Sequence, residues 1–229
     1  MTSNNREKRR AQLRINYNKW LSNRLLENLL PADKTEFYDS LFHSWIERIE
    51  AGKKVELEWL EEHLKNIPEE HIEDYAEDIV KADELSNDMY AALMVNIWSS
   101  FEKMFSNCVR AWNIESASPI SPNMHRDMYR IKTVLQTFKN KFGIDLKSLP
   151  KYEYANAVRC MANCYKHNGG KYKVPNDYPI DNNLAQKLGI IAERKIGYAN
   201  LPTLEILTSC GSFARSMLEE LRIKMSVPH

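Results

Sequence analysis

One stretch decides the fold: residues 154–170 read YANAVRCMANCYKHNGG. At about 100° per residue, a helix sorts this run into two faces. The run ends in Asn168-Gly169-Gly170, which is typical of a left-handed helix cap. We therefore predict a helix from about Pro150 to His167, whose buried face carries Tyr154, Ala157, Val158, Met161, Cys164 and Tyr165.

The opposite face of this helix carries Arg159, Asn163, Lys166 and His167. A guanidinium can hold a phosphate in bidentate fashion, and an imidazole can act as acid or base near neutral pH. The amide of Asn163 can orient either group. A solvated face is the other interpretation, since a helix C-terminus favours Lys and His whatever their role. Spacing alone leaves both interpretations open.

The rest of the chain repeats apolar residues at helical spacing, and it holds only 7 Gly and 9 Pro among 229 residues. Both features favour an all-α fold. Further helices are predicted over residues 5–30, 33–52, 55–66, 69–113, 123–142 and 204–224. We expect an interruption near Asp83–Asn87 in the helix over residues 69–113. Gly143 is expected to end the helix over residues 123–142. Residues 190–196 are predicted as a short strand or a helical turn.

The composition excludes several classes of protein. No run of about 18 apolar residues could span a membrane, and the basic N-terminus lacks the apolar core of a secretory signal. The cysteines are scattered through helical patterns, which predicts reduced thiols in a cytoplasmic protein. One compact fold is expected, with an N-terminal helical extension over residues 1–84 packed on a main domain over residues 85–229.

Charge is unevenly distributed although the net charge is only +1. Residues 122–173 hold eleven Lys or Arg against three acids. A basic region around a candidate site suits a polyanion, although a solvated face would look the same. Aromatic residues interleaved with lysines also suit single-stranded RNA. The candidate RNA-binding residues are Lys151, Lys171, Tyr172 and Lys173.

Residues 159–170 fit the pattern R-x-x-x-N-x-x-K-H-x-x-G. This run resembles the signature helix of the HEPN superfamily (higher eukaryotes and prokaryotes nucleotide-binding domains). The upstream run NIWSSFEKMFSNCVRAW, residues 96–112, resembles the first long helix of that family. The resemblance covers about residues 85–224, and it implies an all-α, HEPN-like helical bundle.

The resemblance also implies a function: a homodimeric, metal-independent endoribonuclease of the toxin or antiviral-defence type. In such enzymes the ribose 2′-OH attacks the adjacent phosphate, leaving a 2′,3′-cyclic phosphate and a 5′-OH. It assigns His167 as general acid or base, Arg159 as phosphate binder and Asn163 as orienting group. Lys166 and Glu102 are supporting candidates. RNA, a second copy of the chain and an antitoxin or other protein are the implied partners, with no cofactor and no metal.

The match departs from the family pattern at one point, because Ala162 and not an arginine directly precedes Asn163. The nearest arginine is Arg159, with seven residues between it and His167. Since HEPN domains without catalysis also exist, the alternative is a silent helical module that binds a protein partner or a nucleotide. A regulator that binds nucleic acid through its basic N-terminal helix is a third hypothesis.

The same helix carries residues for two further kinds of site. Cys160, Cys164 and His167 have the spacing of three zinc ligands, but the sequence offers no nearby fourth ligand. A thiol nucleophile paired with a histidine is also conceivable, although no element of an oxyanion hole is readable.

Overall fold

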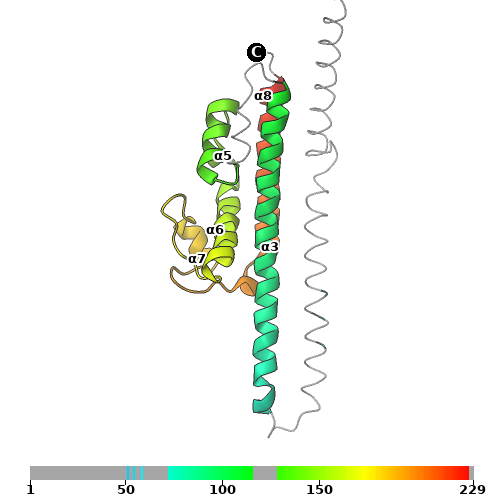
Figure 1. Ribbon diagram of the computed structural model, residues 1–229, viewed down its shortest axis with the longest axis vertical. Helices are drawn as coiled ribbons and strands as arrows, with labels where there is room; N and C mark the ends of the chain where they lie inside the picture. Colours follow the sequence, from blue (N-terminus) through cyan, green and yellow to red (C-terminus); the bar gives the residue numbers. More distant parts are fainter. Residues whose placement is uncertain (1–50, 52–53, 55–57, 59–71, 116–127, 227–229) are drawn as a thin grey trace, which may run out of the picture. The chain divides into compact units, whose positions relative to one another are not determined.

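The computed structural model describes residues 72–115 and 128–226, together with residues 51, 54 and 58. Every regular element in these residues is helical, so the predicted all-α class is confirmed for them (Figure 1). The main helices are α3 (Ile72–Glu115), α5 (Ile131–Thr137), α6 (Tyr152–Asn168), α7 (Asn182–Lys187) and α8 (Thr203–Ser226). None of the described helices is both long enough and apolar enough to cross a lipid bilayer.

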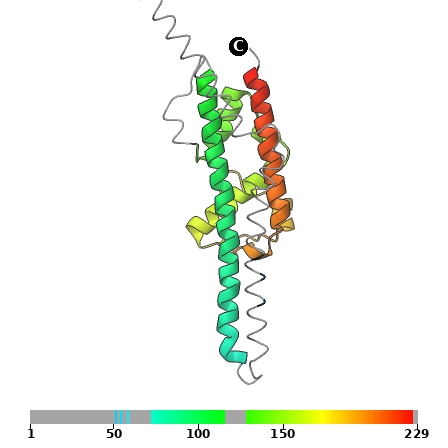
Figure 2. The ribbon, with the colours of Figure 1, turned by 90° about the vertical axis from the view of Figure 1, so that its right-hand side faces the viewer.

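The helices predicted before residue 69 lie outside the described residues, apart from residues 51, 54 and 58, which are helical. Helix α3 has no interruption near Asp83–Asn87, which corrects that expectation (Figure 2). Asp83 and Asn87 lie on exposed or half-exposed positions of a continuous helix, where polar side chains need no break in the chain. The predicted boundary between residues 84 and 85 falls inside α3.

The chain divides into two compact units, each built from separated stretches of sequence. The described part of the first unit comprises residues 100–115, 128–150 and 212–226. The described part of the second comprises residues 72–99 and 151–211, with residues 51, 54 and 58. The candidate residues 151–173 all belong to the second unit.

The first unit has an aromatic core. The Phe105 and Phe138 rings pack edge to face at 5.7 Å between centroids, and Phe138 packs likewise on Phe142 at 4.8 Å. Helix α5 continues directly into a π-helical turn, η2 (Phe138–Phe142), which ends at Gly143 with φ 68°. The predicted helix end at Gly143 is confirmed, and its left-handed backbone suits glycine, since residues with a side chain adopt this conformation only at a cost.

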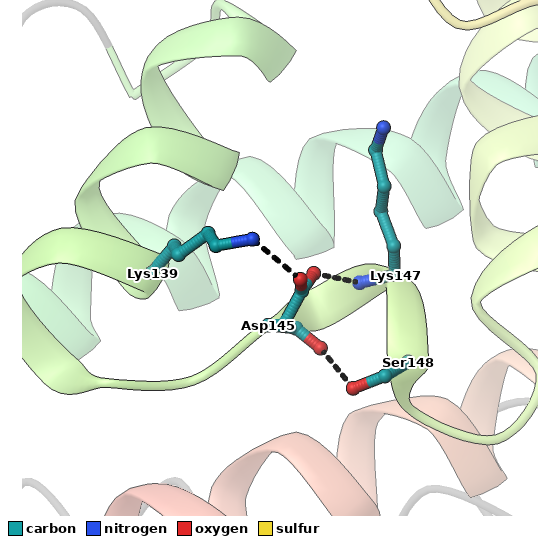
Figure 3. A network of polar contacts seen from close by, with 4 residues as sticks. All are labelled: Lys139, Asp145, Lys147 and Ser148. Atoms are coloured by element: carbon teal, nitrogen blue, oxygen red, sulfur yellow. Dashed lines mark hydrogen bonds and ion pairs between the residues drawn. The ribbon is translucent and has the colours of Figure 1, made fainter.

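A polar network follows this helix end in the same unit (Figure 3). The Asp145 carboxylate accepts hydrogen bonds from Lys139 Nζ at 2.9 Å and from the Lys147 amide at 3.2 Å. Ser148 Oγ donates to the Asp145 carbonyl at 2.8 Å. Asp145 thereby caps the short 3-10 helix η3 (Leu146–Ser148), and the Lys139 hydrogen bond holds the pKa of the Asp145 carboxyl below its usual value.

In the second unit, the ends of α6 agree with the prediction to within two residues. The helix begins after Lys151 and ends at Gly169, whose φ of 57° is left-handed. The Gly170 amide donates to the Cys164 carbonyl at 3.0 Å, which satisfies one of the last carbonyls of the helix. Residues 190–196 form neither a strand nor a helix; the described residues contain one isolated bridge, between Lys171 and Lys195.

A polar cluster joins α6, α7 and α8 within the second unit. The Glu205 carboxylate accepts hydrogen bonds from the Tyr154 hydroxyl and from Lys187 Nζ. Lys187 Nζ also donates to the Tyr154 hydroxyl at 3.1 Å. The Lys187 hydrogen bond lowers the pKa of Glu205, and the Glu205 hydrogen bond raises the pKa of Lys187.

Removing an aromatic ring from the first core should destabilise the protein. Phe138 is completely buried, so Phe138→Ala leaves a cavity and should lower the free energy of unfolding by about 3–5 kcal/mol. Tyr129→Ala, at an aromatic residue that is 56% exposed, serves as the matched control and should cost less than about 1 kcal/mol. Urea unfolding followed by circular dichroism measures both values. Equal losses in the two variants would contradict the assignment of this core.

The Glu205 cluster should make stability depend on pH in a defined direction. A carboxyl whose pKa is lowered by folding stabilises the protein above its unfolded pKa, and this contribution is lost as the pH falls through the folded pKa. Glu205→Gln should therefore lower the melting temperature at pH 7, and the difference from the wild type should shrink as the pH falls below about 4.5. Glu219→Gln, at an exposed carboxylate, is the control. A difference that stays constant from pH 7 to pH 3 would contradict the role of the cluster.

Candidate functional site

Arg159 lies in the middle of α6 and is only 7% exposed, so of the two interpretations the solvated face is wrong at this position. Its Nε donates to Asn156 Oδ1 at 3.0 Å. Its Nη2 donates to the Tyr178 carbonyl at 2.5 Å and to Cys160 Sγ at 3.2 Å. Nη1 donates to no acceptor within the residues that the structure describes. The guanidinium is thus fixed on one side and has two N–H donors left on Nη1.

The loop after α6 covers Arg159. Asn156 Nδ2 donates to the Tyr178 carbonyl at 3.2 Å and to the Pro179 carbonyl at 2.9 Å. Tyr178 adopts φ 53°, a left-handed conformation that is strained for a residue with a side chain. Its carbonyl accepts hydrogen bonds from three α6 side chains, Asn156, Arg159 and Cys160, and these hydrogen bonds hold the loop on the helix.

A pocket of about 280 Å³ opens beside this cluster, and we call it the Arg159 pocket. Its polar lining consists of Arg159, Asn163, Asn168, Lys173 and Asn176. The remaining lining residues are Cys160, Cys164, Val174 and Pro175. The structure thus brings two of the three predicted catalytic residues, Arg159 and Asn163, to one cavity.

His167 is placed differently. It is exposed on the last turn of α6 with Lys166, and neither residue belongs to the described lining of the Arg159 pocket. The helix explains this, because an offset of eight residues turns His167 by about 80° away from Arg159. The imidazole is accessible to solvent, but the structure does not gather it with the guanidinium around the cavity.

The Arg159 pocket is electropositive. Arg159 and Lys173 line it, whereas no Asp or Glu is among the lining residues described. Arg159 also forms no ion pair with a carboxylate in the described residues, so its buried charge is balanced only by neutral acceptors. A buried charge without a counter-ion is costly, and an anion that reached the cavity would reduce that cost.

The two cysteines of the pocket are buried and free. Burial raises the pKa of the Cys160 thiol to about 11, and burial also raises the pKa of Cys164. Both remain protonated near neutral pH, which makes them poor nucleophiles. No group of three His, Cys, Asp or Glu in the described part of the chain is arranged to hold a metal ion. Neither the thiol-nucleophile nor the zinc alternative gains support.

The four predicted RNA-binding residues do not gather at one site. Lys173 lines the Arg159 pocket. Lys171 pairs with Glu193 at 3.2 Å, and Lys151 Nζ lies 5.3 Å from the centre of the Tyr154 ring. Tyr172 is buried, and its hydroxyl accepts a hydrogen bond from the Ile180 amide, so its ring offers no open face for a base.

Glu102 lies half-buried on α3 and belongs to the first unit, whereas the other candidates belong to the second. Asn156 was not identified from the sequence as a candidate site residue. Its spacing of three residues from Arg159 on a helix was the available signal, since residues three apart are neighbours on a helix surface.

A second pocket in the same unit has the opposite charge. Its volume is about 480 Å³, and Asp83, Glu84 and Asp88 contribute to its lining together with Lys195 and Tyr165. Three carboxylates against one cation disfavour an anionic ligand. Of these two cavities, only the Arg159 pocket suits a phosphate.

Comparisons with protein-family models, with curated proteins and with solved structures find no match to this chain.

Proposed function

We propose that this protein binds RNA, with one backbone phosphate held in the Arg159 pocket. The observation that carries the proposal is the buried Arg159 guanidinium, which lines a cavity and has no carboxylate partner in the described residues. A phosphate would accept charge-assisted hydrogen bonds from the two N–H groups of Nη1, which have no acceptor among the described residues. The Asn163 amide and the Lys173 ammonium line the same cavity and suit the same ligand.

A chain of phosphates is favoured over a single small anion by the surroundings of the cavity. Lys166 and His167 are exposed on the last turn of α6, beyond Asn163 on the same helix. Lys166 extends the positive charge past the cavity, as binding to a polyanion requires. The resemblance to the HEPN superfamily points to the same ligand class. This proposal keeps the RNA ligand of the endoribonuclease hypothesis without its cleavage step, and it differs from the silent-module alternative, whose ligand is a protein partner or a nucleotide.

Metal-independent cleavage of the bound RNA is the second candidate function. It is favoured by His167, whose exposure leaves the imidazole free to exchange protons with a ligand on the helix surface. In this proposal His167 moves the proton of the 2′-OH or of the 5′-oxygen, Arg159 holds the phosphate and Asn163 orients it. A homodimer, in which a second copy faces the first, belongs to this proposal.

Binding is tested with fluorescently labelled single-stranded RNA and anisotropy. Arg159→Ala should weaken RNA binding about tenfold or more, because the phosphate loses its charge-assisted hydrogen bonds from the guanidinium. Lys173→Ala should weaken it severalfold with unchanged stability, since Lys173 is exposed. Lys103→Ala removes the same charge from an exposed position on α3 and is the control.

Two results would overturn the binding proposal. One is wild-type protein that leaves the RNA free at 100-fold excess over the probe in low salt. The other is a folded Arg159→Ala variant with wild-type affinity. Inorganic phosphate and a mononucleotide as competitors separate a polymer site from a small-anion site, because only the polymer reaches Lys166, which lies outside the described lining of the pocket.

Cleavage is tested by incubating the protein with end-labelled RNA in EDTA. The cleavage proposal expects products with a 2′,3′-cyclic phosphate, and His167→Ala should slow their formation about 100-fold or more while RNA affinity stays the same. Sedimentation of the same samples measures the oligomeric state. Intact RNA after prolonged incubation at high protein concentration would reject catalysis and leave binding as the function.

A further inference from the structure

Asn156 fixes the position of the arginine that faces the cavity, and as a neutral amide it adds no counter-charge. A guanidinium at the end of three methylene groups has many rotamers, and fixing it costs conformational entropy. Here the Nε donor is bound by Asn156 Oδ1 at 3.0 Å, while Nη2 is bound by the Tyr178 carbonyl. Two hydrogen bonds from different nitrogens fix the plane of the fork. Nη1 is the part of the fork left for a ligand.

The chemistry of its neighbours leaves Asn156 one orientation. The Tyr178 and Pro179 carbonyls can only accept hydrogen bonds, so the Nδ2 amine must face them. Oδ1 then faces Arg159 Nε, which can only donate. Asn156 is 6% exposed, so every polar atom of this buried amide has a partner. The loop therefore holds Asn156, and Asn156 holds Arg159.

The neutrality of Asn156 matters as much as its geometry. An aspartate at this position would accept from Arg159 Nε equally well, but its charge would form an ion pair with the guanidinium. Arg159 would then no longer lack a counter-ion, and an incoming phosphate would meet a neutral pair. An amide accepts the Nε hydrogen bond and leaves the positive charge in place.

We propose that Asn156 is a positioning residue that orients the Arg159 guanidinium for an anion and keeps its charge uncancelled. The inference rests on the proposed binding of RNA phosphate in the Arg159 pocket. It adds a residue that does not line the cavity in the described structure, and it explains why a buried amide and not a carboxylate accompanies the arginine.

Asn156→Asp and Asn156→Ala test the proposal with the labelled RNA probe, whose phosphodiesters do not titrate between pH 5 and pH 8. At pH 8, Asn156→Asp should weaken RNA binding about tenfold or more, and by a larger factor than Asn156→Ala. Both variants lose the donor to the loop carbonyls, and only Asn156→Asp adds a negative charge beside Arg159. The melting temperature of each variant measures the structural damage, and RNA binding by Asn156→Asp should be weaker than that damage accounts for.

The pH profile gives a second readout. The Arg159 guanidinium should hold the pKa of the new carboxyl at position 156 below its ordinary value, so Asn156→Asp should stay weakened from pH 8 to pH 5, measured relative to wild type at each pH. Recovery of RNA affinity already at pH 5 would contradict the ion pair. Asn156→Ala should stay weakened by the same factor throughout. Asn183→Asp adds the same charge at an exposed position on α7, and it should bind RNA as the wild type does.

The outcomes distinguish the two proposals. Wild-type protein that fails to bind RNA overturns the proposed function. Wild-type protein that binds, together with a folded Asn156→Asp variant that binds no more weakly than Asn156→Ala at pH 8, overturns the role of Asn156 alone. If Asn156→Asp does not fold, Asn156→Ala with wild-type RNA affinity overturns it. Circular dichroism at each pH verifies folding.

Discussion

The hydrogen bond from Arg159 to the Tyr178 carbonyl joins the central helix of the second unit to a loop with little regular structure of its own. A guanidinium carries a permanent charge, and burying it demands acceptors that surround it closely. The loop supplies one main-chain carbonyl, and α6 supplies the Asn156 amide. The Arg159 pocket lies beside this arrangement, and its positive charge follows from the choice of neutral acceptors.

The helical class was predictable because it depends on local patterns that each segment carries by itself. The apolar stripe of residues 154–165 placed α6, and the glycines at 143 and 169 marked helix ends that the structure confirms. The expected interruption of α3 was wrong because polar residues at exposed positions were interpreted as a break. Helix α7 was missed because its six residues carry too short a pattern to separate from the loop.

The candidate site was predictable in part. Polarity and spacing grouped Arg159 with Asn163, and the two residues share a cavity, but these patterns could not decide whether Arg159 was solvated or buried. A helical projection sorts residues by polarity, and it contains no information about which distant loop will cover a given face. The loop through Tyr178 lies nineteen residues from Arg159, and only tertiary folding brings its carbonyl to the guanidinium. His167 was placed on the same helix face as Arg159, although eight residues of helix rotate its side chain by about 80° away from that of Arg159.

The left-handed backbone of Tyr178 has a consequence for the loop itself. A residue with a side chain pays about 1 kcal/mol for this basin, and here the hydrogen bonds to its carbonyl offset the expense. The conformation therefore depends on these tertiary hydrogen bonds and is not the one that the local sequence prefers. Wherever the guanidinium exchanges that carbonyl for a stronger acceptor, the loop has a lower-energy backbone to relax into.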